Sequence, residues 1–174
     1  MMDMHNYRQP EIKLRPVSIS NGIAWSNDSK LMFYNDSPTR KVDAFDFDLE
    51  KGLISNRHTV FNFEANNITG VPDGMTIDTD GNLWVACFRG WKVIKIDPRT
   101  GNLLEIYPFP VAKVSSVMFG GPGLSTLYVT TGRVGLTPEE LAYQPDAGSL
   151  FAIKHTGARG FPEHQFIFPG ASSY

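Results

Sequence analysis

The chain has 174 residues, of which 41% are hydrophobic and 20% are charged, the ordinary range of a folded domain. Its formal net charge of −2 and the absence of long runs of like charge point to neither a nucleic-acid nor a membrane-surface partner. No segment reaches the ~20 apolar residues of a membrane helix, and residues 1–15 lack the apolar stretch of a signal peptide. We therefore expect a cytoplasmic protein whose partner is a small molecule.

Short apolar runs separated by Gly, Pro, Asn and Asp predict an all-β chain. The first four predicted strands occupy residues 20–25, 31–34, 42–48 and 53–63. The same order of strands returns at residues 72–77, 83–88, 93–97 and 103–109. A third unit has strands at residues 114–119, 127–131 and 149–154, and its last strand is missing or weak.

The first two units can be superimposed on one another along the sequence. Leu31 aligns with Leu83, and the turn at 48–52 aligns with the turn at 97–101. Repeats of about 40 to 50 residues with four strands each are typical of β-propeller blades, and a β-sandwich is the weaker alternative. We expect an N-terminal remnant (1–16), three four-stranded blades within 17–155, and a C-terminal tail (156–174). The approximate blade limits are 17–64, 72–110 and 114–155.

The long connection 132–147 contains a helix start. Thr137 is a good N-cap residue, Pro138 is favoured in the first turn, and the two glutamates that follow suit the positive end of a helix. We expect one short helical turn at this point. The single cysteine, Cys87, lies within the apolar run 83–88, so we expect a buried, unreactive thiol.

Two polar residues hold equivalent positions at the start of the innermost strands. Asn21 and Asp73 each precede a glycine and an apolar strand, so the same backbone geometry would turn both side chains into the propeller channel. Amide and carboxylate oxygens are suited to calcium, magnesium or manganese, and zinc also accepts them. The alternative is that Asn-Gly and Asp-Gly are ordinary turn dipeptides.

The remaining acidic residues and the histidines give no comparable signal. Several aspartates are expected to be surface groups that flank turns and bond nearby backbone: Asp46, Asp48, Asp78, Asp80 and Asp97. The histidines, His5, His58, His155 and His164, show no metal-ligand spacing. The chain also lacks the Gly-x-Ser-x-Gly motif and a phosphate-binding glycine loop, which argues against a serine hydrolase or a nucleotide enzyme.

Several segments resemble one known family over about residues 17–154. The first unit contributes Ile-Ser-Asn-Gly at 19–22, Val-Asp-Ala-Phe-Asp-Phe-Asp at 42–48 and Ile-Ser-Asn-Arg at 54–57. The second unit contributes Pro-Asp-Gly-Met at 72–75 and Leu-Trp-Val-Ala-Cys at 83–87, and the third contributes Phe-Gly-Gly at 119–121 and Leu-Tyr-Val-Thr at 127–130. Together they are similar to the family of regucalcin, gluconolactonases and the insect luciferin-regenerating enzyme.

The resemblance implies a six-bladed propeller that holds a divalent cation, calcium above others, and opens a sugar lactone. It assigns two metal ligands to Asn21 and Asp73, and it makes Asp73 the general base. The family's glutamate ligand and its substrate-contacting residues belong to three blades that this chain lacks. The resemblance therefore implies a fragment, a shortened form or a misplaced start, whose activity alone is in doubt.

Two further possibilities accompany the lactonase hypothesis. The chain could bind calcium as a regulatory protein without turnover. It could also associate with itself through unpaired blade faces, since two halves would complete a ring.

Overall fold

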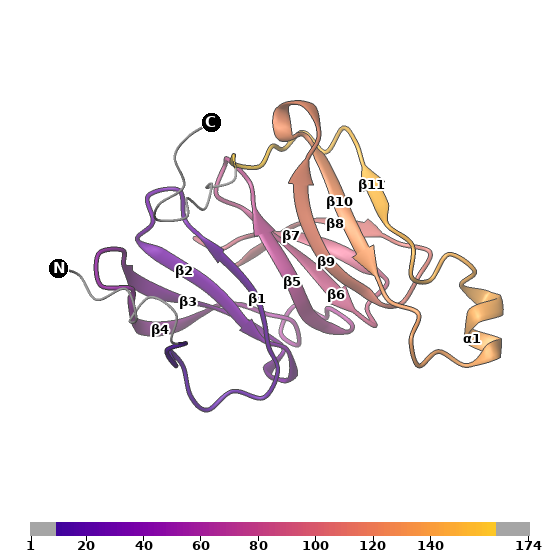
Figure 1. Cartoon of the computed structure of the whole chain (residues 1–174), viewed down its shortest axis with the longest axis horizontal. Helices are drawn as coiled ribbons and strands as arrows, with labels where there is room; N and C mark the ends of the chain where they lie inside the picture. Colours follow the sequence, from indigo (N-terminus) through magenta and orange to yellow (C-terminus); the bar gives the residue numbers. More distant parts are fainter. Residues whose placement is uncertain (1–9, 163–174) are drawn as a thin grey trace.

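The computed structural model describes residues 10–162, so parts of the predicted N-terminal remnant and C-terminal tail, with His5 and His164, lie outside it. Within this range the chain is all-β, as predicted, with three antiparallel sheets lying side by side (Figure 1). The sequence begins in the purple sheet and passes through the pink sheet to the orange and yellow one. No helix in this described range is long and apolar enough to cross a membrane.

Each sheet is a meander in which consecutive strands pair. The first sheet contains β1 (Ser20–Trp25), β2 (Leu31–Asp36), β3 (Lys41–Asp48) and β4 (Leu53–Asn62). The second contains β5 (Val71–Ile77), β6 (Leu83–Phe88), β7 (Lys92–Asp97) and β8 (Asn102–Pro108). The third contains β9 (Val114–Gly120), β10 (Thr126–Thr131) and β11 (Phe151–Ile153). The third sheet lacks a fourth strand among the described residues, in agreement with the prediction.

Three short helices lie between strands: η2 (Ser37–Thr39), η3 (Pro122–Leu124) and α1 (Pro138–Tyr143). The predicted helix start is confirmed in α1. The Thr137 hydroxyl accepts from the backbone of Glu140 at 3.2 Å, and the Glu140 carboxylate accepts from the backbone of Thr137 at 2.8 Å. This reciprocal capping box satisfies backbone donors that a helix start otherwise leaves free.

Two hydrophobic cores hold the sheets together, and β6 contributes to both. Successive side chains of a strand point to opposite faces. Leu83, Val85 and Cys87 therefore pack against the first sheet, while Trp84 and Ala86 pack against the third. All five are fully buried. The innermost strands β1, β5 and β9 are consequently neighbours, with β5 in the middle.

Candidate metal and catalytic site

The predicted site residues lie at matching irregularities in the innermost strands. In β1 the pairing with β2 shifts by one residue between Ser20 and Ile23, and in β5 the pairing with β6 shifts between Pro72 and Met75. Such bulges redirect side chains and are frequent beside active sites. Asn21 and Asp73 therefore lie at equivalent bulges on two adjacent blades.

The glycines that follow Asn21 and Asp73 do not lie in turns, so Asn-Gly and Asp-Gly are not turn dipeptides here. Gly22 and Gly74 lie inside strands, and neither has a positive φ. A Cβ on Gly22 would lie 2.4 Å from the carbonyl oxygen of Asp73, and one on Gly74 would lie 2.8 Å from the Cα of Ser116. Both positions require glycine because the neighbouring inner strand approaches too closely for a side chain.

Asn21 and Asp73 come together as the repeat predicted. Desolvation by partial burial raises the pKa of the Asp73 carboxyl, while hydrogen bonds from the Asn21 side chain and the Gly74 backbone oppose that rise. The Asn21 amide also donates to the hydroxyl of Ser37 at 3.3 Å. Two hard oxygen donors, one of them a half-buried carboxylate, thus share one location.

Asn35 lies next to this location and contacts the Asp73 backbone. Its side chain is fully buried at the end of β2, and its Nδ2 donates to the carbonyl oxygen of Asp73 at 2.8 Å. Its Oδ1 has no hydrogen-bond partner among the described residues, although buried polar atoms are normally satisfied. Only the fold brings β2 of the first blade against β5, so no sequence signal marks this residue.

The third blade repeats the irregularity at Ser115. The pairing of β9 with β10 shifts between Val114 and Ser116, which gives Ser115 the position that Asn21 and Asp73 hold in their blades. Its hydroxyl lies 2.9 Å from that of Thr130. Extending the repeat register from Pro72-Asp73-Gly74 to Val114-Ser115-Ser116 would have found it from the sequence.

The donor set fits part of a cation site. Carboxylate and amide oxygens are the ligands that calcium prefers, but calcium takes six to eight of them. No group of three or more His, Cys, Asp or Glu residues is placed to hold a metal within residues 10–162. Asn21 and Asp73 would therefore supply a minority of the ligands.

Most of the other aspartates bond nearby backbone as predicted, but Asp78 is fully buried and not the surface group expected. Asp48, Asp78 and Asp97 each accept hydrogen bonds from backbone amides two to four residues later. Asp46 instead accepts from the Asn56 side chain at 2.5 Å, while the Asp80 carboxylate makes no hydrogen bond within the described chain. None of the five joins the Asn21–Asp73 location.

Cys87 has the buried environment predicted for it. Its side chain is fully buried between the first and second sheets, and desolvation raises the pKa of its thiol to about 12. A thiol that stays protonated near neutral pH is a poor nucleophile.

Comparisons with known proteins agree with this architecture. The family model for the SMP-30/Gluconolactonase/LRE-like region matches residues 2–133. Regucalcin from Oryctolagus cuniculus is 47% identical over 150 residues, which cover 86% of this chain and 50% of the rabbit protein. The chain thus spans about half the length of the curated relatives it matches.

Solved structures of the same family also match this chain over about half of their length. A luciferin-regenerating enzyme matches with a TM-score of 0.78 and 42% identity, covering 83% of this chain and 48% of that protein. A calcium-binding protein, regucalcin, from Agrobacterium tumefaciens also has a TM-score of 0.78, at 25% identity, covering 87% of this chain and 50% of its own. The three sheets are therefore blades of a partial β-propeller of the regucalcin type, and the chain belongs to the SMP-30/gluconolactonase/LRE-like family.

Proposed function

We propose that this chain contributes Asn21 and Asp73 to the divalent-cation site of a sugar lactone hydrolase, with calcium as the preferred cation. The observation that carries the proposal is the pairing of an amide and a half-buried carboxylate at equivalent bulges of β1 and β5. Zinc, manganese and magnesium are the alternatives, because neither oxygen donor discriminates strongly among these ions.

In this proposal Asp73 takes the proton from the attacking water. The water oxygen bonds to the lactone carbonyl carbon, the ring C–O bond breaks, and Asp73 returns its proton to the departing ring oxygen. The products are a carboxylic acid and a free hydroxyl on one open chain. A bound divalent cation supplies positive charge that polarises the carbonyl during attack. Partial burial suits a general base, because it makes the carboxylate more basic than a solvated one.

Asn21 has a positioning role beside Asp73. Its amide hydrogen-bonds Asp73 and Ser37, so its orientation is set on two sides. Asn35 holds the Asp73 backbone through its own amide. The contact from Asn21 is to the Asp73 side chain and the contact from Asn35 is to its backbone, and both support a positioned carboxylate, which catalysis by a general base requires.

A regulatory calcium-binding protein without turnover is the second candidate. It needs only the cation ligands Asn21 and Asp73 and no substrate contacts, and no substrate contact is assigned at this site among the described residues. The two candidates make the same prediction for cation binding and opposite predictions for hydrolysis.

The test is hydrolysis of D-glucono-δ-lactone by the purified chain, followed as acid release above the spontaneous rate. The reaction is run with calcium, zinc, manganese or magnesium and with a chelator. Asp73→Asn is the test variant, and Asp80→Asn is the matched control because Asp80 is exposed on a turn. Cation-dependent turnover lost only in Asp73→Asn supports the hydrolase. Cation binding in a calorimetric titration without turnover supports the regulatory protein. The absence of both cation binding and turnover contradicts each candidate.

A further inference from the structure

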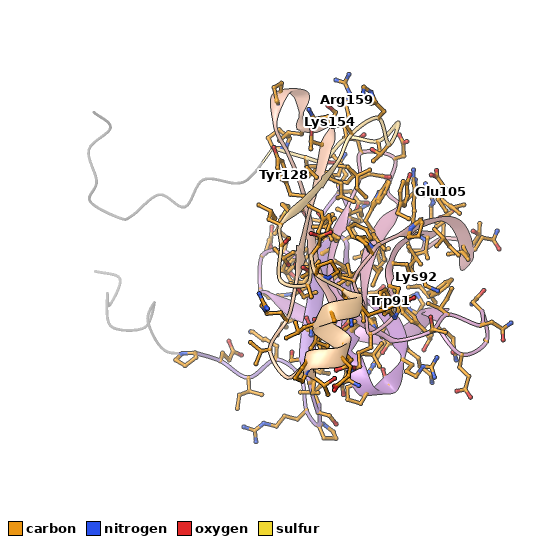
Figure 2. The ribbon with its side chains drawn as sticks, turned by 90° about the vertical axis from the view of Figure 1, so that its right-hand side faces the viewer. Trp91, Lys92, Glu105, Tyr128, Lys154 and Arg159 are labelled. Carbon is orange, nitrogen blue, oxygen red and sulfur yellow. The ribbon has the colours of Figure 1, made fainter. Side chains whose placement is uncertain are left out.

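A pocket separate from the Asn21–Asp73 site lies where β6 turns into β7 and meets α1. Its volume is about 570 Å³. The residues that line it include Arg89, Trp91, Lys113, Glu139, Tyr143 and Gln144. Figure 2 shows Trp91 beside α1, and the Trp91 and Tyr143 rings meet edge to face with centroids 6.1 Å apart. One wall of the pocket is therefore aromatic.

The backbone of the β6–β7 turn is strained on both sides of Gly90. Arg89 has a φ of 59° and Trp91 has a φ of 61°, values that residues other than glycine rarely adopt. The Trp91 carbonyl accepts from the Phe109 amide at 2.8 Å, which holds this turn against the chain beyond β8. Arg40 has a φ of 56° and accepts from the Phe63 amide at 2.9 Å in the first blade, so this turn is a repeated feature that holds Trp91 in place beside the pocket.

Lys113 brings a buried positive charge to the pocket without an acidic partner. The residue is only 6% exposed, and its ammonium donates to the carbonyl of Val134 and lies 5.9 Å from the centre of the Phe88 ring. No carboxylate lies within 4.0 Å of this ammonium in the described part of the chain. Buried charges are normally paired, so the pocket favours an anionic group.

Gln144 adds a second buried donor. It is 3% exposed, and its Oε1 accepts from the backbone of Ala112 at 2.7 Å, which leaves its Nε2 protons for another partner. Arg89, exposed at the rim, provides a third donor group. An ammonium, a guanidinium and an amide are together suited to a carboxylate.

The pocket also carries features that a simple anion would not need. The carboxylates of Glu139 and Glu140 line it, and Glu140 is already engaged by the helix cap while Glu139 is exposed. An exposed carboxylate accepts hydrogen bonds from hydroxyl groups, and the aromatic wall suits the C–H face of a carbohydrate. The lining therefore matches a ligand with one carboxylate and several hydroxyls.

We propose that this pocket binds a sugar acid through Lys113, Arg89 and Gln144, with Trp91 and Tyr143 against its carbon chain. The choice of ligand class rests on the proposed function, because opening a sugar lactone produces such an acid. The pocket is linked to the strand that carries Asp73, since Phe88 pairs with Val71 at the start of β5 and bridges to Lys113. It would receive the product without sharing its residues with the cation site.

The test is calorimetric titration of the full chain with D-gluconate, in EDTA so that no divalent cation contributes. Sorbitol, the neutral polyol, and acetate, the bare carboxylate, are titrated in parallel. Gluconate is expected to bind more tightly than either. Sorbitol binding equally well would overturn the role of the carboxylate, and acetate binding equally well would overturn the role of the hydroxyls.

Variants place the binding in the pocket. Arg89→Glu and Lys113→Met are each expected to weaken gluconate binding by about tenfold or more, the scale of losing a charge-assisted hydrogen bond. Arg159→Glu makes the same charge change at a distant edge, where Figure 2 labels Arg159, and is expected to bind normally. Arg89 is exposed, so its variant remains informative if Lys113→Met fails to fold. Unchanged affinity in Arg89→Glu would overturn the proposal.

The same titration separates this proposal from the proposed function. Asp73→Asn is expected to keep its gluconate affinity while it loses lactone hydrolysis. Gluconate binding without hydrolysis by the unmodified chain would retain the pocket and contradict the hydrolase. Hydrolysis without gluconate binding would retain the hydrolase and contradict the pocket.

Discussion

Replacing Gly22 with alanine tests whether the close approach of β1 and β5 builds the Asn21–Asp73 site. The new Cβ would lie 2.4 Å from the Asp73 carbonyl oxygen, 2.6 Å from Asn35 Nδ2 and 3.0 Å from the Met75 nitrogen. Two of these atoms belong to the β5 backbone, so the strands must separate. Overpacking of this kind costs about 1–3 kcal/mol. Losing the 2.8 Å Asn35–Asp73 hydrogen bond adds about 1 kcal/mol.

We therefore expect Gly22→Ala to lower the free energy of unfolding by about 2–4 kcal/mol, the sum of these two effects. Urea unfolding followed by tryptophan fluorescence measures it. Gly132→Ala is the matched control, because a Cβ there would lie 3.6 Å from the Lys113 Cβ, an ordinary van der Waals distance. The reasoning is refuted if the two variants differ by less than about 0.5 kcal/mol, the usual effect of a neutral surface change.

Three further predictions concern the core, the thiol and the helix cap. Asp78→Ala should lower the free energy of unfolding in urea by about 3–5 kcal/mol, because the buried Lys95 ammonium, now 3.3 Å from the carboxylate, and the indole N–H of Trp84 would both lose their partner. A decrease below about 1 kcal/mol would contradict this. Cys87, whose pKa is raised from 9.0 to about 12, should resist thiol reagents at pH 8 until the chain unfolds, and stability should fall as pH rises above 9; labelling at the unfolded rate would show the thiol to be accessible. Thr137→Ala should cost about 1 kcal/mol locally, seen as faster amide exchange in α1 with β5–β8 unchanged.

Strand positions were readable from the sequence because each blade repeats one pattern of apolar runs and turns. The expected limits of β1, 20–25, and of β6, 83–88, are those of the structure. The third blade was predicted with three clear strands because its run near Phe151 is followed by a segment rich in Gly and Pro without a clear strand pattern. Alternation along β6 also explains the buried Cys87, since every side chain of a strand between two packed sheets faces a core.

Residues of the candidate site could be predicted from the sequence only where they occupy equivalent positions in the repeat. Asn21 and Asp73 could be paired because equivalent positions in a repeat share their backbone geometry. Asn35 could not be found, because its contact with Asp73 joins residues 38 positions apart on different blades. Lys113 and Arg89 were likewise invisible, since their shared pocket depends on where α1 returns to the sheets.

Calorimetric titration of the chain with calcium, and in parallel with zinc, manganese and magnesium, would show whether Asn21 and Asp73 together bind a divalent cation. We expect the unmodified chain and Asp80→Asn to bind calcium with equal affinity, and Asp73→Asn and Asn21→Ala to bind it about tenfold or more weakly. Equal calcium affinity in Asp73→Asn and the unmodified chain would rule out a cation site at these residues.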